Sequence, residues 1–242
     1  MKVLCIVQAR MGSERLPGKV LKPILDKPMI MYVLDRLKKS RYIDEIVLAT
    51  SQQDEEKPLV EAVQKNGYQV FRGEENYVLK RYIDTYRKYG GDVIVRITGD
   101  CPLIDPQIVD HVISYYLAYD YDYVRLDVPE TFIRGFDVEV FSSKALEKVY
   151  EEVDKMDNES YKEHVTLYMY RNQDKFKVGY VEGQELYNKN YRLCVDTKED
   201  FEVVERIYGH FKDEYVLAKD VVMFLDENVE VARVNSEVIQ RG

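Results

Sequence analysis

Three fixed positive charges and two glycines lie close together near the start of this chain. They follow a short apolar run, in the order Arg10, Gly12, Arg15, Gly18 and Lys19. Backbone N–H groups exposed by glycine turns and guanidinium groups both match phosphate oxygens in geometry and charge. The formal net charge of the whole chain is -9, so this loop is locally positive in a protein that is negative overall. The loop is predicted to bind phosphate.

The spacing within the loop excludes two familiar nucleotide-binding loops. A Walker loop has four residues between its glycines and Ser or Thr after its lysine, whereas five residues separate Gly12 from Gly18 and Val20 follows Lys19. No Gly-x-Gly-x-x-Gly follows the first apolar run, which excludes the dinucleotide fingerprint. A lysine-rich turn between a strand and a helix is the structural alternative. Any metal ion must be held by residues outside the loop.

Two aspartates from distant parts of the chain each follow an apolar, strand-like run. Asp100 follows residues 93–97 after a Thr-Gly pair, and Asp196 follows residues 191–195. Open α/β sheets bind ligands at the carboxyl ends of their strands, and carboxylate oxygens are suitable ligands for Mg²⁺. A helix cap or a turn is the structural alternative for each aspartate. We expect both carboxylates to meet at one sheet edge and to share one ion.

Apolar strands alternate with helical patterns through the first half of the chain, which predicts βαβ units in a parallel sheet. The predicted strands are Val3–Val7, Glu45–Ala49, Gln69–Phe71 and Val93–Ile97, and later Asp137–Phe141, Phe176–Val181 and Tyr191–Val195. Helical spacing predicts one helix after Pro28, one after Asp105, two between Ser142 and Tyr170, and one around Phe201. The expected fold class is α/β, a Rossmann-like, mostly parallel sheet flanked by helices. Residues 1–242 form one domain, and residues 127–190 form a small α+β insertion.

Composition excludes several classes of protein. With 45% hydrophobic and 33% charged residues, the chain has the composition of a globular protein. The acidic net charge argues against a nucleic-acid partner. The first apolar run is too short for a signal peptide or a membrane span, so we expect a cytoplasmic location and no membrane partner. Cys5, Cys101 and Cys194 are expected to be reduced and buried, without a catalytic role.

The segment from Gln8 to Leu21, QARMGSERLPGKVL, resembles the signature loop of the CMP-sugar synthetase-like nucleotidyltransferases. The likeness is greatest to the branch of the spore coat polysaccharide biosynthesis protein SpsF. It extends over essentially the whole chain and includes VDTKED at residues 195–200, where Lys198 stands at a position that is commonly proline in the family. This family is similar to the acylneuraminate and KDO cytidylyltransferases, which join CTP to an acidic sugar and release pyrophosphate.

The resemblance implies an Mg²⁺-dependent cytidylyltransferase of surface polysaccharide or glycan biosynthesis, with CTP as co-substrate and Asp100 and Asp196 as metal ligands. The expected catalytic residues are Arg10, Lys19, Asp100 and Asp196. The residues expected to contact the nucleotide are Gln8, Ala9, Arg10, Gly12, Ser13, Arg15, Lys19, Thr50, Ser51, Arg72 and Arg96. Arg10, Arg15 and Lys19 would clamp the β- and γ-phosphates while an acceptor oxygen attacks the α-phosphorus in line. Ordinary ion pairing is the alternative for Arg72 and Arg96.

Two later segments resemble the substrate-side motifs of the family. They place Arg134, Asp137, Glu139, Glu163 and His164 at the acceptor. Asp137 and Glu139 share a face if they lie on a strand, and this pair could bind sugar hydroxyls, an amine or a second metal ion. A structural role is the alternative for His164. In this family, a region like residues 127–190 usually holds the acceptor pocket and the contacts of a homodimer.

The sequence does not indicate which acceptor is used. Two other functions are compatible with the same residues. One is a glycosyltransferase that consumes a nucleotide sugar, because such enzymes share the nucleotide-binding sheet. The other is a non-catalytic nucleotide-binding partner in a biosynthetic complex.

Overall fold

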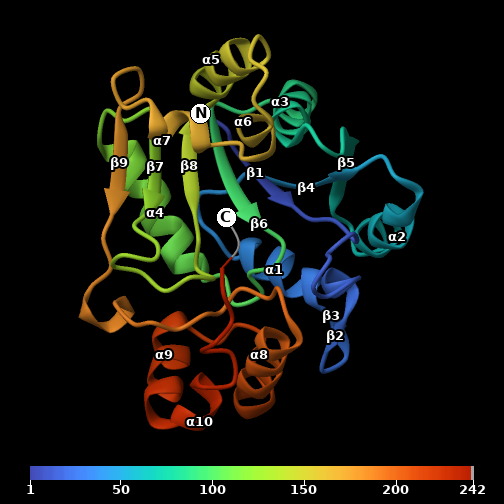
Figure 1. The fold of residues 1–242 in the computed structure, drawn as a ribbon, viewed down its shortest axis with the longest axis vertical. Helices are drawn as coiled ribbons and strands as arrows, with labels where there is room; N and C mark the ends of the chain where they lie inside the picture. The colour runs from blue at the N-terminus through green and yellow to red at the C-terminus, as the bar shows by residue number, and fades with distance from the viewer. Residues whose placement is uncertain (241–242) are drawn as a thin grey trace.

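A seven-stranded sheet with helices on both faces forms the body of the protein in a computed structural model that describes residues 1–240 (Figure 1). The strand order is β5-β4-β1-β6-β8-β7-β9. The strands are β1 (Val3–Gln8), β4 (Glu45–Ser51), β5 (Gln69–Gly73), β6 (Val93–Thr98), β7 (Tyr123–Leu126), β8 (Glu139–Ser142) and β9 (Val178–Val181). Neighbours pair in parallel, except that β8 runs antiparallel to β6 and β7. The predicted mostly parallel α/β fold is confirmed.

Two groups of helices cover the sheet. One face carries α1 (Met29–Leu37), α2 (Lys57–Lys65), α4 (Pro106–Ala118), α8 (Lys198–Phe211), α9 (Ala218–Glu227) and α10 (Val229–Ala232). The other carries α3 (Val78–Tyr89), α5 (Ser143–Val153), α6 (Glu159–Glu163) and α7 (Leu167–Arg171). Short elements complete the fold: β2 (Pro23–Ile24), β3 (Lys27–Pro28), and 3-10 turns η1 (Lys19–Leu21), η2 (Asp54–Glu56) and η3 (Glu185–Tyr187). Figure 1 shows α8, α9 and α10 gathered at the lower end of the molecule.

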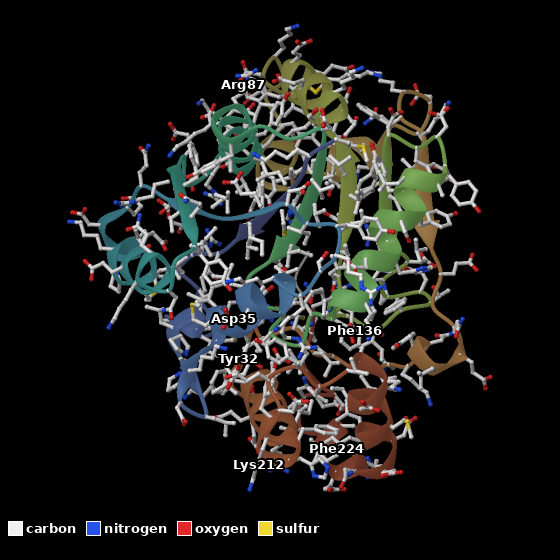
Figure 2. All side chains as sticks on the ribbon, turned by 180° about the vertical axis from the view of Figure 1, so that it is seen from behind. Tyr32, Asp35, Arg87, Phe136, Lys212 and Phe224 are labelled. Atoms are coloured by element: carbon white, nitrogen blue, oxygen red, sulfur yellow. The ribbon has the colours of Figure 1, made fainter. Side chains whose placement is uncertain are left out.

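Burial on both faces explains why the central strands are almost entirely apolar. Every residue from Val3 to Val7 is buried, as expected for a parallel strand covered by helices on both sides. Between the sheet and the C-terminal helices, Tyr32 on α1 packs against Tyr208 on α8 with ring centroids 4.4 Å apart (Figure 2). Because β1, β4 and β6 are parallel neighbours, their carboxyl ends meet at one edge, where Gln8 pairs with both Ala49 and Thr98.

Side-chain caps fix the starts of two of the helices. Asp105 caps α4 by accepting a hydrogen bond from the Gln107 N–H. Thr197 and Asp200 form a capping box at the start of α8.

The three cysteines are unpaired and buried, as predicted. Within residues 1–240, no helix combines the length and apolarity needed to cross a bilayer.

Two predictions of local structure were wrong. Residues 191–195 do not form a strand; the segment makes one isolated parallel bridge, between Arg134 and Arg192. Residues 142–170 hold three helices instead of two, and His164 directly follows α6 as its C-cap.

The single domain and the small α+β insertion at residues 127–190 stay predictions. These residues contribute β8 and β9 to the main sheet, and their role in acceptor binding or dimerisation also stays a prediction.

The contact between residues 134–135 and residues 193–194 should tolerate no side chain at Gly135. Gly135 has a φ of +112°, and an added Cβ would lie 2.5 Å from the carbonyl carbon of Leu193 and 2.7 Å from the nitrogen of Cys194. We therefore expect Gly135→Ala to lower the free energy of unfolding by about 3 kcal/mol, measured by urea denaturation. Gly209→Ala in α8 is the control, because its Cβ would meet no atom within 4 Å and should stabilise the helix by up to about 1 kcal/mol. Equal stability of the two variants would contradict this prediction.

Candidate active site

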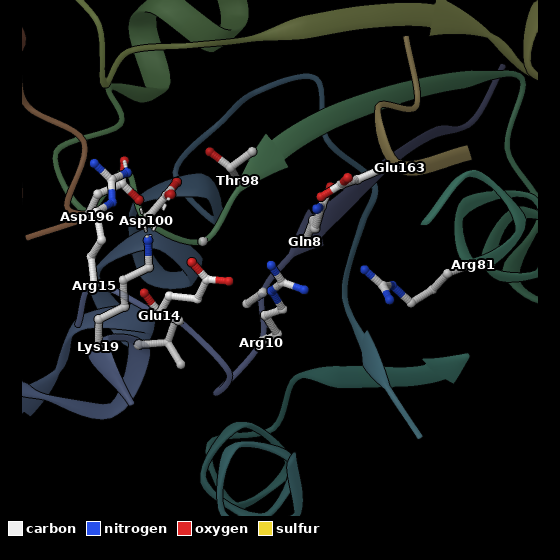
Figure 3. A pocket seen from close by; sticks show the side chains of 14 residues that line it. Gln8, Arg10, Glu14, Arg15, Lys19, Arg81, Thr98, Asp100, Glu163 and Asp196 are labelled. Carbon is white, nitrogen blue, oxygen red and sulfur yellow. Dashed lines mark hydrogen bonds and ion pairs between the residues drawn. The ribbon is translucent and has the colours of Figure 1, made fainter. Parts of the chain in front are cut away.

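A polar cleft of about 450 Å³ opens where β1 and β6 end (Figure 3). Predicted site residues in its lining are Gln8, Ala9, Arg10, Ser13, Arg15, Lys19, Asp100, Glu163 and Asp196. Other lining residues include Glu14, Val20, Arg81, Thr98 and Gly99. The structure therefore brings the charged loop, both strand-end aspartates and one predicted acceptor residue into a single cavity.

The loop after β1 is closed by hydrogen bonds to one peptide. The Met11 carbonyl accepts from the N–H of Ser13 at 2.9 Å and from the N–H of Gly18 at 3.0 Å. Gly18 has a φ of +68°, a left-handed conformation that glycine adopts without strain. This turn starts the 3-10 segment η1, whose first residue, Lys19, is buried against the cleft.

The Lys19 ammonium joins the two aspartates. Its Nζ donates to Asp100 Oδ2 at 3.1 Å, to Asp196 Oδ1 at 2.8 Å and to the Val195 carbonyl at 2.7 Å. Figure 3 shows the lysine reaching up between the two carboxylates. All three ammonium donors are thus satisfied in a position that is only 8% exposed.

Burial and charge act in opposite directions on this group of residues. Burial favours the neutral form of Lys19, but the charges of Asp100 and Asp196 outweigh it and raise the pKa of the ammonium. Burial would raise the pKa of Asp100, but the Lys19 charge and hydrogen bonds from Thr98 and Lys19 lower it. Lys19 and Asp100 therefore both stay ionised at neutral pH.

Two arginines also bind Asp196. Its Oδ2 lies 2.9 Å from Arg15 Nη2 and 2.6 Å from Arg192 Nη2. The Arg192 Nε binds Asp200, a buried carboxylate that also accepts from the backbone N–H of Asp196 at 2.9 Å. Asn235 donates to Asp200 as well, at 2.8 Å. Sequence reasoning missed Arg192 because it lies in the run that was read as a strand.

Arg81 is a second cleft residue that sequence reasoning missed. It is 2% exposed on α3, and its Nη1 donates to the Glu74 carbonyl at 2.6 Å. Burial lowers the pKa of this guanidinium, and the nearby Arg10 charge lowers it further. A basic residue in an amphipathic helix gave no signal that distinguished it from a solvent-exposed one.

Five residues expected at the nucleotide lie outside the cleft lining, and Arg96, the fifth of them, is described in the next paragraph. Thr50 and Ser51 are buried and hydrogen-bond to the Glu56 carboxylate. Arg72 donates to the backbone carbonyls of residues 51–53. Gly12 lies at the outside of the loop, where an added Cβ would be 3.1 Å from Glu55 Oε1.

Arg96 and Glu139 form a largely buried ion pair, and ion pairing was the alternative to nucleotide binding for Arg96. They face each other across β6 and β8, with Arg96 Nη1 2.6 Å from Glu139 Oε2. Glu139 also accepts from Tyr123 at 3.0 Å and from Thr166 at 3.1 Å. Neither residue of the pair lines the cleft. The structure gives this glutamate a full set of partners within the fold.

Only one of the remaining residues expected at the acceptor lines the cleft. Glu163 lines the cleft, whereas Arg134, Asp137 and His164 do not. Asp137 accepts from the Gly135 N–H at 2.7 Å, and burial raises its pKa. The predicted strand at residues 137–141 is observed as β8 from Glu139 to Ser142, so Asp137 directly precedes the strand.

The two aspartates satisfy one test of a metal site. Both carboxylates reach one ammonium nitrogen, so they are close enough to share one cation. Their oxygens suit Mg²⁺. Within residues 1–240, no three His, Cys, Asp or Glu side chains gather as a metal-binding group. Water and substrate oxygens would complete the coordination of such an ion.

Comparisons with known proteins agree on one family. Residues 4–227 match the model of a family described as Cytidylyltransferase. The chain is 40% identical to an uncharacterized protein of Methanocaldococcus jannaschii, over 100% of this chain and 98% of that protein. It is 34% identical to the spore coat polysaccharide biosynthesis protein SpsF of Bacillus subtilis, over 95% of this chain and 96% of that protein. The structure of a cytidylyltransferase from Leptospira borgpetersenii superposes with a TM-score of 0.90 at 33% identity, covering both chains fully.

The largely buried pair of Arg96 and Glu139 predicts a stability that depends on pH. Burial would raise the pKa of Glu139, but the charges of Arg96 and Arg125 outweigh it and lower the pKa below the ordinary 4.5. A depressed pKa stabilises the fold above pH 4.5, and this contribution is lost as the pH falls through the folded-state value. Glu139→Gln should therefore lower the free energy of unfolding by about 3 kcal/mol at pH 7. Below pH 4.5 the difference in free energy of unfolding between the variant and wild type should become smaller.

Urea denaturation at several pH values measures this gap. Glu147→Gln is the matched control, because the pair of Arg87 and Glu147 is 49% and 31% exposed and should contribute less than about 1 kcal/mol. A gap between wild type and Glu139→Gln that stays constant from pH 7 to about pH 3 would contradict the assignment.

Proposed function

Because this chain belongs to the cytidylyltransferase family, we propose that it transfers the cytidylyl group of CTP to a sugar or related small acid, with release of pyrophosphate. The observation that carries this proposal is the meeting of the charged loop and two carboxylates in one cleft. The SpsF relative supports a role in surface polysaccharide or glycan assembly. The cytoplasmic location expected from the sequence stays a prediction.

Arg10, Arg15 and Lys19 would bind the β- and γ-phosphates of CTP. Arg10 is exposed on the cleft and forms no ion pair with the other residues of the described chain. Guanidinium and ammonium groups bind phosphate oxygens through charge-assisted hydrogen bonds. These groups would orient the α-phosphorus for in-line attack and stabilise the departing pyrophosphate.

Asp100 and Asp196 would hold Mg²⁺. The bound ion would neutralise charge on the α-phosphate and lower the pKa of the acceptor hydroxyl. The chain needs no nucleophile of its own, because nucleotidyl transfer depends on positioning and charge neutralisation. The task of these residues is therefore geometric and electrostatic.

The acceptor would approach from the side of α6, where Glu163 lines the cleft. A carboxylate at this position can accept hydrogen bonds from sugar hydroxyls. We infer that residues 127–190 supply the rest of the acceptor pocket and the contacts of a homodimer, as the family resemblance implies.

Pyrophosphate release distinguishes the competing functions. The protein is incubated with Mg²⁺, each nucleoside triphosphate in turn and a panel of sugar acids, and the products are analysed by mass spectrometry. CTP-dependent pyrophosphate release together with a cytidylyl ester supports the proposal. Consumption of a ready-made nucleotide sugar would indicate a glycosyltransferase, and nucleotide binding without turnover would indicate a non-catalytic partner.

Asp100→Asn and Asp196→Asn should each lower kcat by at least about a hundredfold, because asparagine keeps the shape but removes the charge that holds the metal. Pyrophosphate release measures kcat, and circular dichroism checks the fold. Asp226→Asn is the matched control, since among residues 1–240 this carboxylate on α9 pairs with Lys189 and Tyr191 and does not line the cleft. Activity like wild type in either cleft variant would refute the metal assignment.

Lys19→Ala should weaken CTP binding by about tenfold or more, because it removes a charge that binds the terminal phosphates. CMP binding should change much less, since CMP lacks those phosphates. Isothermal titration calorimetry measures both affinities. Lys22→Ala is the control, because the Lys22 ammonium lies over the Phe201 ring, 4.9 Å from its centroid, and does not line the cleft. An unchanged ratio of CTP to CMP affinity in Lys19→Ala would count against the clamp.

A further inference from the structure

A buried carboxylate lies next to the charged loop without lining the cleft. Glu56 ends the 3-10 turn η2 and is 1% exposed. It forms no ion pair with any residue in the described part of the chain, 1–240. The charge of Arg81 interacts with Glu56 without a direct contact. Burying a carboxylate that no cation contacts directly costs several kcal/mol unless hydrogen bonds replace water. The hydrogen bonds of Glu56 should therefore show why the fold retains this charge.

Three groups donate to this carboxylate. The Met11 N–H lies 3.1 Å from Oε1 and 3.0 Å from Oε2. The Thr50 hydroxyl donates to Oε2 at 2.8 Å, and the Ser51 hydroxyl donates to Oε1 at 3.4 Å. Both hydroxyls lie at the end of β4 and are at most 1% exposed. Glu56 thus links the rigid end of a central strand to the loop.

The peptide that Glu56 binds is the closing point of the loop. The Met11 carbonyl accepts from Ser13 and Gly18, so the same residue is held by Glu56 through its N–H and holds the far end of the loop through its oxygen. Arg10 directly precedes Met11, and Lys19 directly follows Gly18. The Glu56 carboxylate therefore fixes the backbone beside both cationic residues.

We propose that Glu56 is a positioning residue that sets the conformation of the charged loop, and that Thr50 and Ser51 orient Glu56 instead of reading the nucleotide base. Glu56 touches no substrate and acts through the Met11 peptide. The effect on CTP rests on the proposed function, whereas the effect on loop conformation does not.

The chemistry of the site favours a carboxylate over an amide. A carboxylate only accepts and a backbone N–H only donates, whereas the two hydroxyls can do either. The Met11 N–H lies 3.1 Å from Oε1 and 3.0 Å from Oε2, so either orientation of a glutamine amide would bring its NH₂ group against this donor. Asp at this position would be one methylene too short to reach the same groups.

The experiment compares Glu56→Gln with wild type by two readouts. Hydrogen exchange of the peptide covering residues 9–19 reports the loop without any ligand, and calorimetry reports the affinities for CTP and CMP in the presence of Mg²⁺. We expect exchange in this peptide to become at least about tenfold faster and CTP affinity to fall by about tenfold, with CMP affinity falling less than about threefold. Glu61→Gln, an exposed carboxylate on α2, is the control and should match wild type.

A second pair of variants keeps the test valid if Glu56→Gln does not fold. Thr50→Val removes the hydroxyl that donates to Glu56, and Thr50→Ser retains it. Thr50→Val should speed loop exchange and weaken CTP binding, and Thr50→Ser should restore wild-type values. This rescue separates the hydrogen bond from simple packing.

Loop exchange equal to wild type in folded Glu56→Gln, or in Thr50→Val, would overturn the proposal. Equal loss of CTP and CMP affinity would also overturn it, because it would indicate general damage to the cleft. If wild type binds no CTP, the proposed function fails, while faster exchange confined to residues 9–19 still supports the positioning role.

Discussion

One buried ammonium group holds the cleft together. The Lys19 Nζ binds two carboxylates that lie 81 and 177 residues away along the chain, and it is almost fully removed from solvent. A buried charge is tolerable only when it is paired and its hydrogen bonds are satisfied. Lys19, Asp100 and Asp196 must therefore be placed together, since removing any one leaves uncompensated charge in the cleft. This requirement joins the first loop, the end of β6 and the start of α8 into one unit.

Two of these three groups are positioned by the ends of parallel strands. The third, Asp196, is positioned by a contact outside the sheet. Lys19 and Asp100 follow neighbouring parallel strands, whose carboxyl ends lie at the same edge. Asp196 follows no strand, and its segment is held by the bridge between Arg134 and Arg192 and by the hydrogen bond from Val195 N to the Asp100 carbonyl at 2.8 Å. The close approach at Gly135 belongs to this contact. The reversed strand β8 begins at Glu139, shortly after Gly135, so the same contact connects β8 to the segment that carries Asp196.

The sequence was sufficient to predict the parts of the site that follow strand ends, because apolar runs that end in glycine and a charged residue have a clear pattern. It was insufficient where the deciding contact is long-range. The run at 191–195 is apolar enough for a strand, and only its surroundings leave it without a partner ladder. Arg96 and Glu139 form a pair only because β8 is antiparallel to β6, a register that no local pattern contains. Glu56 follows two other acidic residues at the start of a helix, and its burial depends on Met11, 45 residues away.

The cations around Asp196 fall into two kinds, and the difference bears on how a nucleotide could bind without disrupting the fold. Arg192 is fixed, because Asp200 and Asn235 hold it from the side of α8. Arg15 and Lys19 belong to the loop, and phosphate oxygens are anionic acceptors equivalent to the carboxylates they now contact. If both loop cations turned toward a triphosphate, Asp196 would still be paired with Arg192 and held through its backbone N–H by Asp200. Asp196 thus has partners outside the loop that hold it independently of the loop cations.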